Sequence, residues 1–149
     1  MFKRVLVPLD TTPLSDRVLQ AAFQLTEADG ELIALRIQPE AANLEDNAAC
    51  RTDLDVVDHE TRSVTERVSE AAIAAGFQAS WRAEVRSGPV GNIILEAAGE
   101  LESDCIVMGT HGRKNLAEMF TGSVSERIVA KAPASVVVVK AEGYPFLQD

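Results

Sequence analysis

Two glycine turns near the carboxyl-terminal end of the chain have the residue types that can hold a phosphate group. The first is the sequence GTHG at residues 109–112, the second is Gly122-Ser123, and nine residues separate them. Glycine lets a backbone approach an anion closely and adopt a positive φ at little steric cost. Residues 123–131 follow with helical spacing, and a helix N-terminus offers unpaired N–H groups and a positive dipole. The spacing therefore predicts a phosphate cradle.

Asp10 is a second candidate for chemistry, because it directly follows an apolar stretch at residues 2–9. Two interpretations of Asp10 stay open: a carboxylate that faces a ligand, or a residue that only begins a helix. Thr12 is a suitable N-cap, and Pro13 suits the first helical position. For His111 we prefer a solvated turn residue, because the sequence places no acid or nucleophile beside it.

Stretches typical of strands and of helices alternate along the chain. Aliphatic stretches predict strands at residues 2–9, 32–37, 80–86, 104–108 and 135–140. Apolar spacing predicts helices from Pro13 to a stop at Asp29-Gly30, and at residues 53–75, 90–101 and 123–131. This alternation predicts a doubly wound, Rossmann-like α/β fold, in which helices cover both faces of a five-stranded parallel sheet. The expected strand order is 3-2-1-4-5.

The predicted fold indicates where the candidate residues meet. In open parallel sheets, ligands bind beyond the carboxyl ends of the strands, at the topological switch point. In the order 3-2-1-4-5, the first and fourth strands are neighbours at that point. The loop that begins at Asp10 and the segment 109–123 follow these two strands. We therefore expect both to converge on one site.

The composition narrows the class of partner. With 23 acidic against 14 basic residues, the formal net charge is −9, which disfavours binding to nucleic acids and to anionic membranes. No apolar stretch approaches the length of a membrane span, and no signal-peptide pattern opens the chain. Cys50 and Cys105 form no C-x-x-C pair, and we expect Cys105 to be a small core residue. These features predict a cytoplasmic protein without direct membrane insertion.

Four segments together resemble the universal stress protein family, and specifically its ATP-binding branch. They are RVLVPLD at residues 4–10, VMGTHGR at 107–113, GSVSERIV at 122–129 and PASVVVVK at 133–140. The two glycine turns with nine residues between them are the hallmark of the family, and the resemblance covers residues 2–140. We therefore expect a nucleotide-binding domain at residues 1–141 and a C-terminal tail at residues 142–149.

The resemblance implies roles for five residues around a nucleoside. Pro8 and Leu9 would line the pocket, and Asp10 would lie near the ribose or the phosphate-bound metal. Ile37 would contact adenine with its backbone and side chain. Met108 would pack on the nucleoside side of the site.

The resemblance also implies a set of contacts to the phosphates. The first glycine turn would give the phosphates room, and the second would donate N–H groups, with the Ser123 hydroxyl as an added donor. Arg113 would either reach a phosphate or point to solvent. The residues implied at the phosphates are Gly109, Thr110, His111, Gly112, Arg113, Gly122, Ser123 and Val124.

These features predict ATP with Mg²⁺ as the ligand and nucleotide-dependent regulation in a stress response as the function. ATP would control contacts with a protein partner, such as a transporter or a signalling enzyme. Two alternatives stay open: a slow ATPase or phosphotransferase that uses metal-bound ATP, and a scaffold with a vestigial site. The resemblance further implies a homodimer, with a tetramer as the alternative, through the last strand at Val136, Val137, Val138 and Val139.

Overall fold

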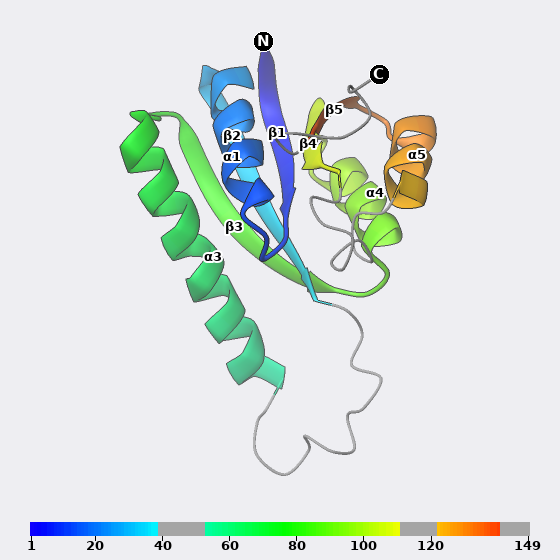
Figure 1. The fold of residues 1–149 in the computed structure, drawn as a ribbon, viewed down its shortest axis with the longest axis horizontal. Coiled ribbons are helices and arrows are strands. Elements are labelled where there is room, and N and C mark those ends of the chain that lie inside the picture. Colours follow the sequence, from blue (N-terminus) through cyan, green and yellow to red (C-terminus); the bar gives the residue numbers. More distant parts are fainter. Residues whose placement is uncertain (39–52, 111–121, 141–149) are drawn as a thin grey trace, which may run out of the picture.

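The computed structural model describes residues 1–38, 53–110 and 122–140, of which residues 53–58, 122 and 123 are described by their backbone alone. Within these residues, strands and helices alternate (Figure 1). The elements are β1 (Phe2–Leu9), α1 (Leu14–Leu25), β2 (Thr26–Gln38), α3 (Asp53–Ala75), β3 (Ser80–Ser87), α4 (Val90–Glu100), β4 (Cys105–Gly109), α5 (Gly122–Lys131) and β5 (Ser135–Val139).

The strands of the described chain form one parallel sheet in the order β3-β2-β1-β4-β5 (Figure 1). This confirms the predicted fold class and strand order. β1 lies at the centre of the sheet, and the chain runs to one edge through β2 and β3. It then crosses back to build the other half from β4 and β5.

Helices bury both faces of the sheet. On one face, α1 and α3 pack over strand residues that include Val5, Val7 and Leu9. On the other face, α4 and α5 pack over Leu6 and Ile106 with their neighbours. β1 is therefore apolar on both sides from its middle onward, as a central parallel strand must be. Among the described helices, none is long and apolar enough to cross a membrane.

Cys105 belongs to this core, as predicted. Its side chain is fully buried. Burial raises the pKa of the Cys105 thiol to about 11, and the neighbouring Asp104 carboxylate adds to the effect. The thiol therefore stays protonated at neutral pH and packs as a small apolar group. Cys50 lies outside the described residues.

The boundary between the first helix and the second strand was wrongly predicted. α1 ends at Leu25, and Thr26 is already extended, with φ −87° and ψ 128°. Thr26 pairs with Phe2, so residues 26–30 belong to the sheet. A Cβ at Gly30 would lie 2.8 Å from the carbonyl oxygen of Lys3. Gly30 therefore allows close approach to β1 and does not end the helix; the other predicted boundaries agree within one residue.

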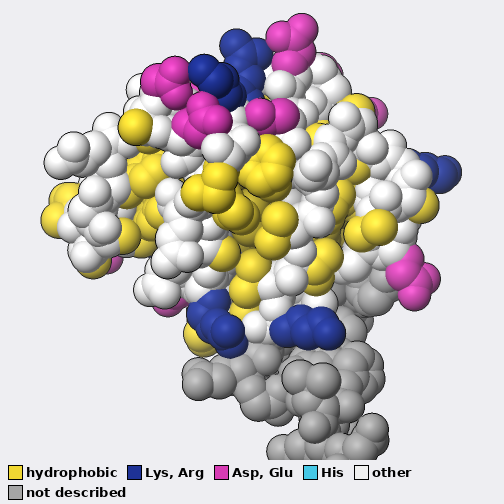
Figure 2. Space-filling view, turned by 90° about the horizontal axis from the view of Figure 1, so that it is seen from above, with side chains coloured by type: hydrophobic (Ala, Val, Ile, Leu, Met, Phe, Trp, Pro, Cys, Tyr) yellow, Lys and Arg dark blue, Asp and Glu magenta, His cyan; other side chains and the backbone are white. Residues whose placement is uncertain are grey.

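Surface charges of both signs lie close together. On the face shown in Figure 2, acidic and basic side chains adjoin at one end, and hydrophobic side chains gather next to them. At the start of β1, the amino terminus of Met1 contacts Glu27 at 2.8 Å and Lys3 contacts Asp29 at 3.0 Å. Exposed pairs of this kind contribute little to stability, because water screens both charges.

Asp104 ties the start of β4 to β1. Its Oδ1 accepts a hydrogen bond from the Arg4 N–H at 2.8 Å, and its Oδ2 accepts one from the Lys3 N–H at 2.9 Å. Its own N–H donates to the Arg4 carbonyl at 3.0 Å. Burial alone would raise the pKa of Asp104, but the backbone hydrogen bonds from Lys3 and Arg4, together with the nearby positive amino terminus, lower it below its ordinary value.

We expect Asp104→Asn to destabilise the fold by about 1 kcal/mol, because one end of the amide presents an NH₂ group to a backbone donor. Folding lowers the pKa of Asp104, so the carboxylate stabilises the fold at pH values above 3.8, the ordinary pKa. This stabilisation is lost as the pH falls through the lower pKa of the folded state. Urea unfolding of the two proteins should therefore show a smaller difference at about pH 3 than at about pH 7.

Glu102→Gln is the control for this experiment, because it removes only an exposed ion pair with Arg4. Its expected cost is below about 0.5 kcal/mol. Equal costs for the two variants at neutral pH would show that Asp104 contributes only surface charge.

Candidate functional site

β1 and β4 separate at their carboxyl ends. Their ladder ends at the pair Leu6 and Ile106. Beyond this pair, β1 continues to pair with β2 as far as Leu9, and β4 continues to pair with β5 as far as Gly109. Pro8, which has no N–H to offer to a ladder, lies in the separated half of β1. The separation lies at the switch point of the sheet, where open α/β sheets bind ligands.

The loop after β1 folds around the Asp10 carboxylate. Asp10 Oδ1 accepts hydrogen bonds from the Thr12 N–H at 2.8 Å, the Thr12 hydroxyl at 2.5 Å and the Ser15 hydroxyl at 2.9 Å. Ser15 Oγ also accepts a hydrogen bond from the Asp10 N–H at 3.1 Å. The carboxylate is therefore fixed through one of its two oxygens.

Thr12 does not cap α1, in contrast to the prediction. Its hydroxyl is used by Asp10. Pro13 takes the N-cap position and makes no side-chain hydrogen bond there. Both the N–H and the hydroxyl of Thr12 donate to the Asp10 carboxylate, so Thr12 belongs to the loop and not to the helix start.

Asp10 Oδ2 differs from Oδ1 in its contacts. Within the described residues, every hydrogen bond to the Asp10 carboxylate ends on Oδ1, and the side chain is half-buried. A carboxylate oxygen can accept a hydroxyl proton or bind a hard divalent cation. The described residues contain no group of three or more His, Cys, Asp or Glu side chains that could hold a metal ion. A metal at Asp10 would therefore need ligands other than a cluster of such side chains from the described residues.

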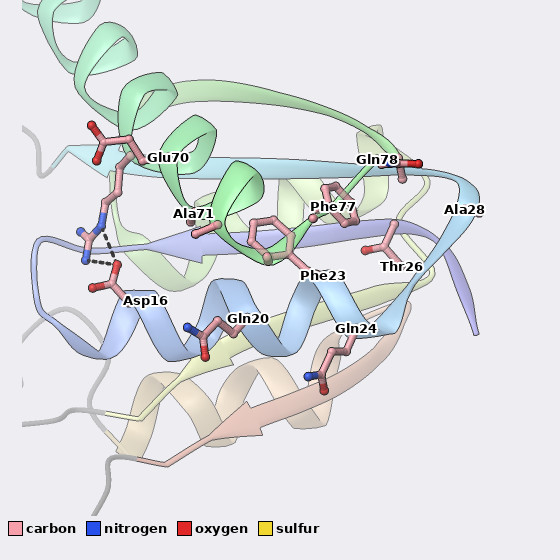
Figure 3. A pocket seen from close by; sticks show the side chains of 15 residues that line it. Asp16, Gln20, Phe23, Gln24, Thr26, Ala28, Glu70, Ala71, Phe77 and Gln78 are labelled. Carbon is pink, nitrogen blue, oxygen red and sulfur yellow. Dashed lines mark hydrogen bonds and ion pairs between the residues drawn. The ribbon is translucent and has the colours of Figure 1, made fainter.

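Arg67 of α3 holds the same loop from the outside. Its Nη1 donates to the Asp10 carbonyl at 3.0 Å, and its Nη2 donates to the Thr12 carbonyl at 2.9 Å. Its Nε and Nη2 also donate to Asp16 Oδ1 at 3.3 Å and 3.2 Å (Figure 3). The loop is thus fixed on the inner side by Ser15 and on the outer side by Arg67.

The glycine segment is described on both sides of residues 111–121. The Thr110 N–H donates to the Val139 carbonyl at 3.0 Å, and α5 begins at Gly122. Thr110 Oγ1 and Ser125 Oγ are buried and have no hydrogen-bond partner among the described residues. Such hydroxyls are costly to leave unpaired. The predicted site residues that lie outside the described ones are His111, Gly112 and Arg113.

The apolar residues predicted to line the pocket are buried in the core. Leu9 is 2% exposed and packs on the face that α1 and α3 cover. Ile37 and Met108, 1% and 0% exposed, pack on the opposite face. Val124, in the first turn of α5, packs against the same cluster as Ile37 and Met108. The structure therefore brings these three residues into one cluster and places Leu9 on the other side of the sheet; Pro8 is also buried.

Comparison with known proteins identifies the family. Residues 1–140 match the model of the Universal stress protein family. The chain belongs to this family. One relative, Universal stress protein MJ0531 of Methanocaldococcus jannaschii, is 27% identical over 143 residues, which cover 94% of this chain and 83% of the relative. Universal stress protein Sll1388 of Synechocystis is 26% identical, with 93% of this chain and 98% of the relative covered.

Solved structures of universal stress proteins share the fold. MJ0577 of Methanocaldococcus jannaschii has a TM-score of 0.73 at 22% identity, over 97% of this chain and 99% of that one. A universal stress protein in complex with cAMP has a TM-score of 0.67 at 20% identity, over 94% and 98%. The Arabidopsis thaliana protein At3g01520, with AMP bound, has a TM-score of 0.61 at 15% identity, over 95% and 93%.

Ser15 and Arg67 contact the candidate site of this universal stress protein, although no sequence motif predicted them. The sequence feature that could have predicted the role of Ser15 is a hydroxyl residue in the first turn of a helix that follows a carboxylate in the preceding loop. Arg67 lies 57 residues from Asp10 on another helix. In the sequence, Arg67 stands out only as a positive charge between Val64 and Val68, on the apolar side of α3. This position predicts a contact only once the element that packs against that side is known.

Gly109 has a packing role beside its place in the family motif. A Cβ at Gly109 would lie 2.8 Å from Leu14 Cδ2 and 3.2 Å from Val18 Cγ2. The first turns of α1 therefore pack directly on the backbone of β4. Because α1 begins where the Asp10 loop ends, this contact also fixes that end of the loop.

We expect Gly109→Ala to destabilise the protein by about 1–3 kcal/mol, because the added methyl group overpacks the contact with α1. In a Leu14→Ala background, the same change should cost less than about 1 kcal/mol, because the side chain that the methyl group would meet is gone. Urea unfolding of the wild type, the two single variants and the double variant measures this coupling. An equal cost of Gly109→Ala in both backgrounds would rule out the packing role.

Proposed function

We propose that this universal stress protein binds ATP together with Mg²⁺ at the switch point, and that the nucleotide regulates contacts with a protein partner in a cytoplasmic stress response. One observation carries the proposal. The Asp10 loop is held by hydrogen bonds on both sides, yet among the described residues none of them reaches the second oxygen of this half-buried carboxylate, where β1 and β4 separate.

The chemistry of this oxygen fits Mg²⁺ that arrives with a nucleotide. Mg²⁺ is usually bound by one or two carboxylates together with phosphate oxygens and waters. Asp10 Oδ2 would supply the carboxylate, and no acidic cluster of the described residues could hold the metal without phosphates. When bound, the metal would neutralise phosphate charge beside an otherwise acidic chain.

The start of α5 supports a phosphate subsite. The backbone N–H groups of Gly122, Ser123 and Val124 belong to the first turn of this helix, where donors have no partner within the helix. The helix dipole favours an anion at the same end. The buried hydroxyls of Thr110 and Ser125 need acceptors or donors beyond the described residues. Phosphate and ribose oxygens of a bound nucleotide could accept hydrogen bonds from the N–H groups of the helix start and from these hydroxyls.

The known neighbours support an adenine nucleotide. One neighbour was solved with cAMP and another with AMP. Adenine, ribose and one phosphate are common to both ligands, which favours recognition of adenosine at the switch point of the sheet. The preference for ATP rests on the Asp10 carboxylate and the second glycine turn, which would serve the additional phosphates and their metal.

We expect ATP with Mg²⁺ to bind at about one molecule per chain, and Gly122→Leu to weaken binding at least about tenfold by blocking close approach to the backbone. Calorimetric titration of nucleotide-free protein with ATP, ADP and AMP measures both. Gly99→Leu is the matched control, because Gly99 is also helical and a Cβ there meets no atom within 4 Å. Intact ATP after titration would favour binding over slow hydrolysis.

The two possible failures of this titration have different meanings. A wild-type protein that binds no nucleotide would contradict the proposed function and favour the scaffold. A wild type that binds ATP, together with a Gly122→Leu variant of unchanged affinity, would contradict only the location of the phosphate subsite.

We also propose that two copies pair through β5, as the family resemblance implies. The opposite edge of the described sheet is β3, which carries a line of ion pairs. Arg82 contacts Glu31 and Glu84, and Arg86 contacts Glu84 and Glu100, at 2.6–3.4 Å. Another strand at this edge would have to desolvate these charges, which disfavours pairing there.

β5 offers an edge without charged side chains. The Ser135 N–H donates to the Asp104 carbonyl, and the Val139 carbonyl accepts from Thr110, so alternate residues of β5 face β4. Val136 and Val138 therefore direct their N–H and C=O groups to the outer edge of the described sheet. A second copy of β5 would satisfy these groups by strand pairing.

We expect Val138→Pro to weaken the dimer at least about tenfold, because proline removes an outward N–H and leaves the ladder to β4 intact. Val138→Thr is the control, since it keeps the N–H and the preference for strand. Size-exclusion chromatography with light scattering over a dilution series gives the mass. A wild type that stays monomeric, or a Val138→Pro dimer of unchanged affinity, would contradict pairing through β5.

A further inference from the structure

Arg67 donates four hydrogen bonds to residues of the loop after β1 and of the first turn of α1. We propose that Arg67 is a positioning residue of the nucleotide site: by binding the backbone of the Asp10 loop, it sets the direction of the Asp10 carboxylate toward a phosphate-bound metal. This inference rests on the proposed function of the site. Arg67 itself touches neither nucleotide nor metal in this scheme and acts through Asp10.

The geometry of the contact requires a guanidinium group. Nη1 and Nη2 reach the carbonyls of Asp10 and Thr12, and Nη2 and Nε reach one oxygen of Asp16. A planar fork with five donors can serve three acceptors at fixed angles. A lysine ammonium carries the same charge on a flexible stem and does not hold several acceptors in one plane. The contact therefore defines the shape of the loop as well as its charge environment.

Arg67 and Ser15 both restrain Asp10, from opposite sides of the loop. Ser15 and Thr12 hold the Asp10 carboxylate through Oδ1. Arg67 donates to the Asp10 carbonyl, which the Ser15 hydroxyl also reaches at 3.0 Å. Rotation of residue 10 would break hydrogen bonds on both sides. A loop that is already ordered does not lose further conformational freedom when a ligand binds, which increases affinity. Loss of Arg67 would remove the charged donor from the Asp10 carbonyl and the side-chain donor from the Thr12 carbonyl. The loop would then be less ordered before binding, and ordering it would reduce the affinity for the ligand.

The packing of α3 does not depend on Arg67. Val64, Val68 and Ala72 of α3 are buried against the face that α1 shares. The rings of Phe23 and Phe77 stack with centroids 4.6 Å apart (Figure 3). Arg67 lines a groove of about 980 Å³ between α1 and α3, and its side chain is 30% exposed. Replacing Arg67 should therefore leave the helix in place, so an effect on binding can be separated from unfolding.

The test compares ATP and adenosine binding in the full chain. Arg67→Met keeps an extended aliphatic side chain and removes every hydrogen bond. We expect it to weaken ATP binding in the presence of Mg²⁺ about tenfold and to leave adenosine binding within about twofold of the wild type. The gain in ATP affinity that Mg²⁺ gives to the wild type should shrink in the same variant. A purely structural role of Arg67 would not separate ATP from adenosine in this way.

Two matched variants isolate the contact to the loop. Asp16→Asn disrupts the ion pair and retains the Arg67 hydrogen bonds to both carbonyls, so ATP binding should stay within about twofold of the wild type. Arg67→Lys keeps the charge and loses the fork, so it should not restore ATP binding. Circular dichroism and thermal unfolding of each variant verify that it is folded.

Each outcome bears on a distinct statement. A wild type without nucleotide binding would overturn the proposed function and this role of Arg67 with it. A wild type that binds ATP, with an Arg67→Met variant that binds equally well, would overturn the role of Arg67 alone. Parallel losses of ATP and adenosine binding in Arg67→Met, or full ATP binding by Arg67→Lys, would also overturn it, because they would indicate general damage or a charge effect.

Discussion

The central position of β1 is the constraint on which the rest of the structure depends. β1 pairs with β2 along its whole carboxyl-terminal half but with β4 only in its middle. Its two neighbours lead the chain away in opposite directions, so the loops that follow β1 and β4 cannot continue side by side. The opening at the switch point is therefore a property of the strand order. The motif residues at Asp10 and Gly109 make use of an opening that the topology creates.

α1 links the two sides of this opening. Its first turn sends Ser15 back to the Asp10 carboxylate, and Leu14 packs against the backbone of Gly109. A shift of α1 would consequently move the end of β4 and the loop after β1 together. On the outer side, Arg67 connects the same loop to α3. The candidate site is thus supported by both helices of one layer, while Ile37 and Met108 lie in the core of the other.

Most of the fold could be predicted because its signals are local. The apolar stripe of residues 53–75 and the following Gly76, with φ +68°, define one helix and its end within the sequence itself. The end of α1 could not be predicted in this way. Thr26 is extended because it pairs with Phe2, a contact that turn-type residues do not indicate. The place of Asp10 was predictable from topology, but its contact with Arg67 was not. Two of the Arg67 hydrogen bonds end on carbonyl oxygens, which no residue type marks in the sequence, and its partner side chain, Asp16, lies 51 residues away.

This choice of partner atoms has an evolutionary consequence. Arg67 contacts main-chain oxygens of residues 10 and 12, which every amino acid possesses. The exposed Thr11 between them takes part in none of these hydrogen bonds. The side chain at position 11 can therefore change while the path of the backbone stays the same. A protein built in this way can acquire a new ligand preference without first losing its scaffold, and a protein engineer could use the same freedom.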